Sequence, residues 1–292
     1  MTTTVQERPR THGSRPRWGT PAWFDHLLRS QGEADPSAYY ALSGYHCARH
    51  EGIAAFLEGS RLPHERTAML DIGCGAGHMT ALLRRRLEFR ETVAIDFVPD
   101  LIERVRRRYP QIRAEVGNPI DLRFRSGEFD LVVAAEVLYY LDAEGRLAAL
   151  EEIRRVLKPG GVFLFTSALG DRYFSRESAH EYVASRFHII ATDCPCHRLY
   201  HMTVGRLSQL RRLDDIVNHH GEPGSPESVR RLESLGWLTR NRAFRTALRM
   251  VGGLSEPVLR ARWIPRIMER ACRLVAPQFS QTNINILAQK DS

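Results

Sequence analysis

Short apolar runs alternate with longer polar segments through the middle of the chain. Runs of this length that are bounded by turn residues predict buried strands, and the segments between them have the spacing of amphipathic helices. Strands that alternate with helices predict an α/β protein with a mainly parallel sheet. The strands predicted in this part lie at residues 69–72, 92–96, 112–116, 129–134, 161–166 and 187–192.

Glycine and proline mark the boundary between one predicted helix and the strand after it. A helix over residues 144–156 is expected to stop at Lys158-Pro159-Gly160-Gly161, because glycine takes left-handed dihedral angles and proline cannot continue the helical hydrogen bonds. The fifth strand then starts at Gly161. A further helix is predicted over residues 175–185.

The segment before the first strand is predicted to be a polar tail followed by helices. Residues 1–19 are polar and arginine-containing and lack the apolar stretch of a secretory signal, so we expect a disordered basic tail in a cytoplasmic protein. Thr20-Pro21 has the form of a helix start. Residues 20–63 are expected to form N-terminal helices, ahead of a core over residues 64–192.

A helical insertion over residues 193–282 is predicted to separate this core from a last strand at residues 283–292. The strand itself is expected at residues 283–289, and a breaker cluster at residues 221–226 predicts a loop inside the insertion. Pro265 is expected to kink the helix around it. An apolar stripe at helical spacing, which should be covered by the core or by a second copy, is formed by Val258, Leu259, Trp263, Ile267, Ala271 and Leu274.

The first strand runs into a turn that has glycine at every second position, from Gly73 to Gly77. Asp71 precedes this turn, and Asp96 ends the second strand. A dinucleotide fingerprint would have its third glycine where this chain has His78, and Asp71 would repel a pyrophosphate. A ligand that carries a sulfonium and an ammonium group, and no phosphate, suits this carboxylate better.

The glycine turn, the acid after the second strand and the order of elements over residues 67–192 resemble the class I S-adenosylmethionine-dependent methyltransferases. The resemblance implies a Rossmann-like seven-stranded sheet whose last strand is antiparallel, flanked by helices. It also implies N-terminal lid helices over the cofactor and an insertion between strands six and seven. The implied activity is methyl transfer, with S-adenosylmethionine as the cofactor.

The resemblance further implies which residues hold the cofactor. Asp96 is expected to accept hydrogen bonds from both ribose hydroxyls, and Asn118 to accept one from the adenine amino group, where many family members have aspartate. The alternative is that Asn118 is only a turn residue. The full set of expected cofactor-binding residues is Tyr45, Arg49, Asp71, Gly73, Gly75, Gly77, Asp96, Phe97, Asn118, Pro119 and Glu136.

Residues of the lid and of the segment after the fourth strand are candidates for binding and catalysis. Tyr45 and Arg49 are one helical turn apart and would hold the methionine carboxylate, unless they are a packing aromatic and a solvated arginine. Tyr140 and its neighbour Tyr139 would shape the acceptor pocket, and one of the two is expected to pack beneath the next helix. His50 is the first candidate for a general base, ahead of His46, His180 and His201.

Charge and cysteine content limit the partners. Forty of the 42 basic residues are arginine, a bias typical of a GC-rich genome, so their number does not by itself indicate nucleic-acid binding. The insertion carries +7 of the net charge of +8. Five cysteines and no secretion signal argue against a disulfide framework. Cys194-Pro195-Cys196-His197 is packed too closely for a zinc site, so we expect no metal.

The acceptor is expected to be a small molecule, a specialised metabolite or sugar that is methylated on oxygen or nitrogen. Residues 136–141 are similar to nodulation-type amino-sugar N-methyltransferases, and no Asp/Asn/Ser-Pro-Pro-Tyr sequence of nucleic-acid enzymes follows the fourth strand. The basic insertion suits an anionic or carrier-bound acceptor, or a homodimer contact, unless its arginines are simply solvated. Two other functions stay open: RNA methylation through the insertion, and a non-methylating rearrangement on the same fold.

Overall fold

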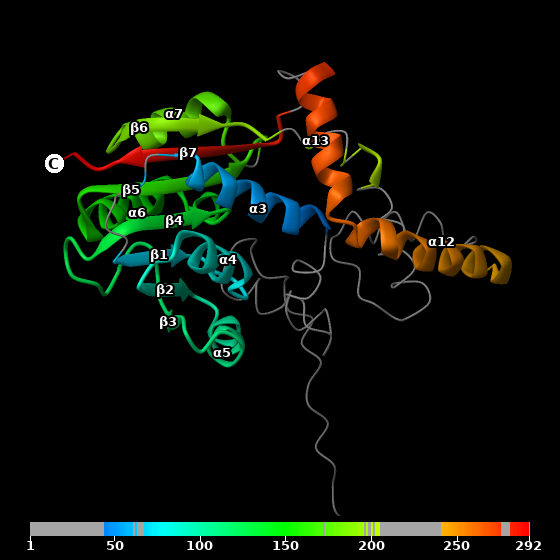
Figure 1. Cartoon of the computed structure of the whole chain (residues 1–292), viewed down its shortest axis with the longest axis horizontal. Helices are drawn as coiled ribbons and strands as arrows, with labels where there is room; N and C mark the ends of the chain where they lie inside the picture. Colours follow the sequence, from blue (N-terminus) through cyan, green and yellow to red (C-terminus); the bar gives the residue numbers. More distant parts are fainter. Residues whose placement is uncertain are drawn as a thin grey trace, which may run out of the picture.

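The computed structural model describes residues 44–60, 62, 67–171, 173–195, 197, 200, 202–204, 241–275 and 281–291. Its centre is a seven-stranded sheet in the order β3-β2-β1-β4-β5-β7-β6, in which β7 alone runs antiparallel to its neighbours (Figure 1). The predicted α/β sheet with an antiparallel last strand is therefore confirmed. The strands are β1 (Ala68–Ile72), β2 (Glu91–Asp96), β3 (Arg113–Val116), β4 (Phe129–Ala135), β5 (Leu157–Ala168), β6 (His188–Asp193) and β7 (Asn283–Gln289).

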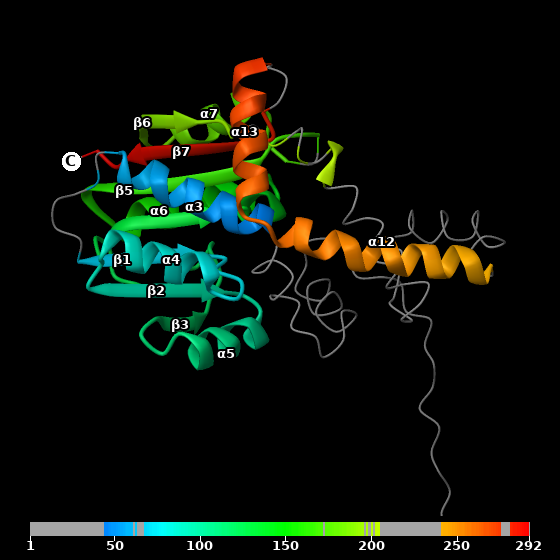
Figure 2. The same cartoon turned by 45° about the vertical axis from the view of Figure 1, so that its right-hand side comes forward.

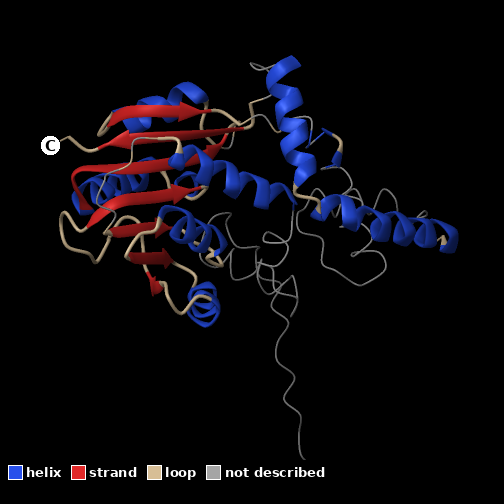
Figure 3. Ribbon diagram, viewed as in Figure 1, coloured by secondary structure: helices blue, strands red, loops and turns tan. Residues whose placement is uncertain are grey.

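Helices cover both faces of the sheet (Figure 3). One face packs against α3 and α4, whose Leu57 and Leu83 are buried with Leu164 of β5, and the other packs against α6 and α7. Central strands are apolar on both faces because both faces are covered. The helices of the core are α3 (Gly44–Glu58), α4 (His78–Leu87), α5 (Pro99–Arg108), the 3-10 turn η1 (Leu138–Tyr140), α6 (Ala143–Val156) and α7 (Arg176–Ala184).

The boundary between α6 and β5 differs from the sequence prediction. The helix ends at Val156 as expected, but β5 begins at Leu157, before the predicted start at Gly161, and includes the Lys-Pro-Gly-Gly segment. Gly160 takes φ +71°, and the register with β4 shifts at this point. Lys158 Nζ lies 2.9 Å from Asp130 Oδ1 of β4. This ion pair holds the irregular start of β5 against its neighbour.

Two helices of the insertion are described, α12 (Arg242–Arg260) and α13 (Trp263–Val275). Both contact α3, and both lie at the end of the sheet to which the parallel strands point (Figures 1 and 2). The expected kink at Pro265 is wrong, because this proline falls in the first turn of α13, where its missing N–H costs no hydrogen bond. Another proline, Pro257, lies inside α12.

The face that α13 turns toward the core is not the predicted stripe. Trp263, Ile267 and Leu274 are 62%, 56% and 85% exposed, so this part of the stripe is uncovered in the single chain. The helix contacts the core partly through arginines instead. Arg266 pairs with Glu51 of α3, and Arg273 Nη2 lies 3.0 Å from an oxygen of Asp193.

Candidate active site

The glycine turn after β1 has the backbone that its sequence predicts. Gly73, Gly75 and Gly77 have φ values of +72°, +54° and +77°, which favour glycine at each position. A Cβ on Gly73 would lie 2.5 Å from Cγ2 of Val137, so that glycine is needed for packing within the protein. A Cβ on Gly75 would meet nothing within 4 Å. Gly75 therefore borders open space that a ligand would fill.

Asp96 lies beside this turn at the carboxyl end of β2. One of its oxygens accepts a 3.0 Å hydrogen bond from the Gly75 N–H, and the other accepts one of the same length from Val98. Burial raises the pKa of this carboxyl, and the backbone donors partly offset that effect. Each carboxylate oxygen keeps a second lone pair, so Asp96 can still accept hydrogen bonds from the two hydroxyls of a ribose.

Asp71 supplies a second buried carboxyl on β1. Its Oδ2 accepts a 2.5 Å hydrogen bond from the Thr80 hydroxyl, while Oδ1 is buried and has no hydrogen-bond partner among the described residues. Burial raises the pKa of Asp71 to about 7, and the neighbouring Asp96 adds to the rise. A buried acceptor without a partner destabilises its surroundings. A cationic ligand beside it would remove that cost, which fits a ligand with an ammonium or sulfonium group.

A polar network joins α3 to the ends of β4, β5 and β7. Glu136 follows β4 with φ +58° and accepts hydrogen bonds from the Ala168 N–H (2.9 Å) and the Asn283 amide (3.1 Å). Arg49 Nη1 lies 3.1 Å from Glu136 Oε1. The Tyr45 hydroxyl donates to Asn283 Oδ1 at 3.3 Å. Tyr45 and Arg49 thus share the face of α3 that is turned toward the sheet.

Tyr45 is also part of an aromatic cluster between α3 and the insertion. Its ring stacks on Tyr200 at 5.3 Å and meets His197 edge-on at 5.1 Å. Burial raises the pKa of the Tyr45 hydroxyl to about 12. The hydroxyl is therefore neutral at ordinary pH and acts as a hydrogen-bond donor rather than as a base.

His50 lies next to Arg49 on α3, and its environment argues against the expected role of general base. Burial, Arg49 and His78 together lower the pKa of His50 to about 3. An imidazole with so low a pKa takes up a proton poorly, because a useful general base has a pKa near the working pH.

The remaining predicted cofactor-binding residues, Phe97, Asn118 and Pro119, follow the ends of β2 and β3. Phe97 is half-buried directly after Asp96. Asn118 is exposed and its side-chain oxygen accepts a hydrogen bond from the Ile120 N–H at 3.2 Å, which is turn behaviour, and Pro119 beside it is buried. An adenine contact by Asn118 therefore stays a prediction.

The two tyrosines after β4 differ in burial. Tyr139 is 9% exposed and packs in the core, and Tyr140 beside it is half-buried, with ring centroids 4.6 Å apart. Burial raises the pKa of Tyr139, as does the charge of Glu136. Tyr139 is thus the one that packs beneath the following helix, and the role of Tyr140 at the acceptor stays a prediction.

Sequence reasoning missed Asn283 and Thr166, which come from strands far apart in the chain. Asn283 is 4% exposed and connects Tyr45 to Glu136. Thr166 is 1% exposed, and its hydroxyl oxygen has no hydrogen-bond partner among the described residues. The signal was Asn283-Ile284-Asn285, because two asparagines on one side of an otherwise apolar strand are unusual for a fully buried face.

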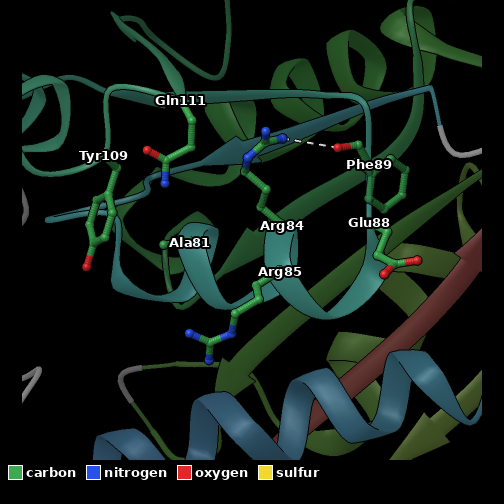
Figure 4. Close-up of a pocket in the computed structure, with 7 residues that line it drawn as sticks. All are labelled: Ala81, Arg84, Arg85, Glu88, Phe89, Tyr109 and Gln111. Atoms are coloured by element: carbon green, nitrogen blue, oxygen red, sulfur yellow. Dashed lines mark hydrogen bonds between the residues drawn. The ribbon is translucent and has the colours of Figure 1, made fainter.

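Other candidates lie apart from this site. A shallow pocket on the outer side of α4 contains none of the predicted site residues; it is lined by Ala81, Arg84, Arg85, Glu88, Phe89, Tyr109 and Gln111 (Figure 4). Among the described residues no group of three acidic, histidine or cysteine side chains is placed to hold a metal ion. Cys196 and His201 lie outside the described part of the chain, as do residues 1–43 with the first predicted helix. No described helix is long and apolar enough to cross a membrane.

Residues 69–161 match the family model of the methyltransferase domain. This segment contains the glycine turn, Asp96 and Glu136. The chain carries a class I S-adenosylmethionine-dependent methyltransferase domain. The domain is similar to nodulation protein S of Rhizobium tropici, with 45% identity over 104 residues, which cover 34% of this chain and 42% of that protein.

A second relative is the malonyl-[acyl-carrier protein] O-methyltransferase of Halorhodospira halophila. It is 34% identical to this methyltransferase domain over 116 residues, which cover 39% of this chain and 37% of that protein. The chain thus spans less than half the length of both relatives. The solved structure of the [4+2]-cyclase SpnF has the same fold, with a TM-score of 0.52 and 18% identity over 84% of this chain and 80% of the other.

Proposed function

We propose that this protein transfers a methyl group from S-adenosylmethionine to a small molecule. The observation that carries the proposal is the pair of buried carboxyls at the glycine turn, Asp71 and Asp96, beside the open space at Gly75. When bound, S-adenosylmethionine supplies a methyl group that is activated by a positively charged sulfur. Asp96 would bind the ribose hydroxyls, and Asp71 would offset the positive charge.

The lid helix α3 would complete this cofactor site. Arg49 and Tyr45 lie on one face of α3, next to the carboxyl end of β4 and the amino end of β7, where they would bind the methionine carboxylate. Phe97 and Asn118 would border the adenine. Arg49 and Asp96 are largely shielded from water, which would strengthen their electrostatic contacts with the cofactor.

We infer that His50, Tyr45 and Tyr139 do not remove a proton from the acceptor, and we propose an acceptor atom from which none has to be removed before methyl transfer. The low pKa of His50 and the raised pKa values of Tyr45 and Tyr139 support this inference, since none of these groups is an effective base near neutral pH. A neutral amine nitrogen or a carboxylate oxygen meets the requirement. Acceptors of this kind include amino sugars and acidic or carrier-bound metabolites.

Two measurements test the proposal. Titration calorimetry should show binding of S-adenosylhomocysteine, and protein incubated with methyl-labelled S-adenosylmethionine should label amines or carboxylates in an acceptor library. A His50→Ala variant should keep its turnover within about threefold, whereas loss of a true general base costs about a hundredfold or more. A hundredfold loss would restore His50 as the base.

A rearrangement without methyl transfer is a second candidate, because the cyclase SpnF has the same fold. In that case S-adenosylhomocysteine would still bind, but a substrate would change its structure without gaining label. An RNA substrate would instead show as binding to total RNA that weakens steeply with salt.

A further inference from the structure

Glu136 has a strained backbone inside the proposed site. It is one of two non-glycine residues with positive φ among the described residues, and the other, Glu88, caps the end of α4. A left-handed conformation is unfavourable for a residue with a Cβ. Strain of this kind persists only where the surroundings fix the residue, and it often marks a functional position.

Several contacts fix the carboxylate of Glu136. Oε2 accepts from the Ala168 N–H of β5, and Oε1 accepts from the amide of Asn283 on β7. Both side chains of the ion pair between Glu136 and Arg49 are largely shielded from water, at 13% and 15% exposure. Water and salt therefore screen this pair much less than a surface pair.

Arg49 is thus already engaged by one carboxylate at the position where the proposed function requires it to bind another. Glu136 is held by the backbone of β5 and by β7, so it cannot follow Arg49 if the guanidinium turns away. The cofactor's carboxylate and Glu136 would then be two anions beside a single guanidinium. Two carboxylates that share one guanidinium in a partly buried site repel each other.

We propose that Glu136 competes with the cofactor's carboxylate for Arg49. The inference rests on the proposed function. Without cofactor, the Glu136 pair holds α3 against the ends of β4 and β5. When the carboxylate of the cofactor takes Arg49, the Glu136 carboxylate keeps its bonds to Ala168 and Asn283 and becomes available to an N–H donor of the acceptor. Cofactor binding would then prepare the acceptor side of the site.

The test compares two ligands that differ only in the carboxylate, S-adenosylhomocysteine and its decarboxylated analogue, by calorimetry. The informative quantity is the ratio of their affinities, because any effect of Glu136 on the shared ammonium group cancels in it. Glu136→Gln removes the charge and keeps the shape and the hydrogen-bonding oxygen. We expect this variant to raise the ratio in favour of S-adenosylhomocysteine by about tenfold.

Glu51→Gln is the matched control. Glu51 lies on α3 and also pairs with arginine, but its partners Arg262 and Arg266 belong to the insertion. This control should leave the ratio within twofold of the unmodified protein, and Arg49→Gln should bring the ratio close to one. An unchanged or lower ratio in Glu136→Gln overturns the competition, as does an unchanged ratio in Arg49→Gln. Failure of both ligands to bind the unmodified protein would overturn the proposed cofactor site itself.

Discussion

The sheet and the exposed face of α13 differ in where their apolar side chains lie. In the sheet, Leu164 and Val133 are fully buried, and most of the buried polar groups of the strands lie near the end to which the parallel strands point. In α13, Trp263 and Ile267 face solvent, while Arg266 is tied to the core. The apolar side chains of the sheet are therefore covered, whereas the exposed face of α13 is available to a partner or to another part of the protein. Substitutions in the sheet should therefore change the free energy of unfolding more than substitutions on the exposed face of α13.

The largest predicted effect is on cofactor affinity, and it comes from a substitution of Asp96 in the sheet. Asp96→Ala removes the acceptor for both ribose hydroxyls, and two lost charge-assisted hydrogen bonds weaken binding by about a hundredfold or more. Calorimetry with S-adenosylhomocysteine measures the loss. Asp96→Asn should bind weakly too while keeping the contacts to Gly75 and Val98 in part. Asp100→Ala, on the nearby helix α5, is the control, and unchanged affinity in a folded Asp96 variant would remove the cofactor assignment.

The two glycines of the turn should separate folding from binding. Gly73→Ala forces a Cβ against Val137 as well as a left-handed backbone, and it should lower the free energy of unfolding by about 3 kcal/mol. Gly75→Ala has the backbone penalty without the clash, about 1 kcal/mol, but its methyl group enters the space predicted for the cofactor. Urea unfolding and ligand titration of both variants check the difference. Equal ligand affinity in Gly75→Ala and the unmodified protein would argue against that placement.

The free energy of unfolding, measured over a series of pH values, should show the titration of the Asp71 carboxyl. Its pKa is about 7 in the folded protein, above the value of about 4 that it has in an unfolded chain. Between these values the folded state holds a proton that the unfolded state has released, so the contribution of Asp71 to stability falls as pH rises from about 4 to 7. Urea unfolding of Asp71→Asn should lack this contribution. Affinity for S-adenosylhomocysteine should rise through the same window, because the ionised carboxyl attracts the ammonium group.

The smallest effects should come from the exposed face of α13. Ile267→Ser should change the free energy of unfolding by no more than about 0.5 kcal/mol, as is usual for surface positions. Leu164→Ala, in the buried sheet, should cost about 3 kcal/mol. Light scattering on Ile267→Ser adds a second reading, because a dimer that becomes a monomer would show that a second copy covers this face. A large loss of stability without a change in mass would mean that the face is buried by the chain itself.

The sequence was sufficient for the sheet because its strands are short apolar runs that are separated by strong turn signals. The glycine turn and Asp96 were found on the same basis, since a turn with positive φ needs glycine wherever it occurs. The placement of β7 was found because Asn283–Gln289 is the one apolar run after the insertion. Local patterns succeed where local chemistry determines the conformation.

The sequence was insufficient where long-range contacts decide. Helical spacing placed an apolar stripe on α13 but could not tell which side of the helix faces inward. In the structure Ile264 and Met268 pack against Tyr200 and Val204, while Arg266 pairs with Glu51 of α3. His50 looked like a base because its own type has a pKa near 6.5. Its neighbours, which come together only in the fold, lower that value. The connection of Asn283 to Glu136 likewise joins distant parts of the chain and leaves little trace in the sequence.

The position of β7 between β5 and β6 has a consequence for the order of events during synthesis. Among the strands that the structure describes, β6 is hydrogen-bonded to β7 only, although residues 194–282 are made between the two strands. A ribosome-bound chain that has emerged only as far as α13 can pair β1 to β5, but it must leave β6 unattached. Such a nascent protein exposes an unpaired strand edge, which favours aggregation. Closure of the sheet is therefore a late step, and a chaperone that shields β5 would be needed most while the insertion is being translated.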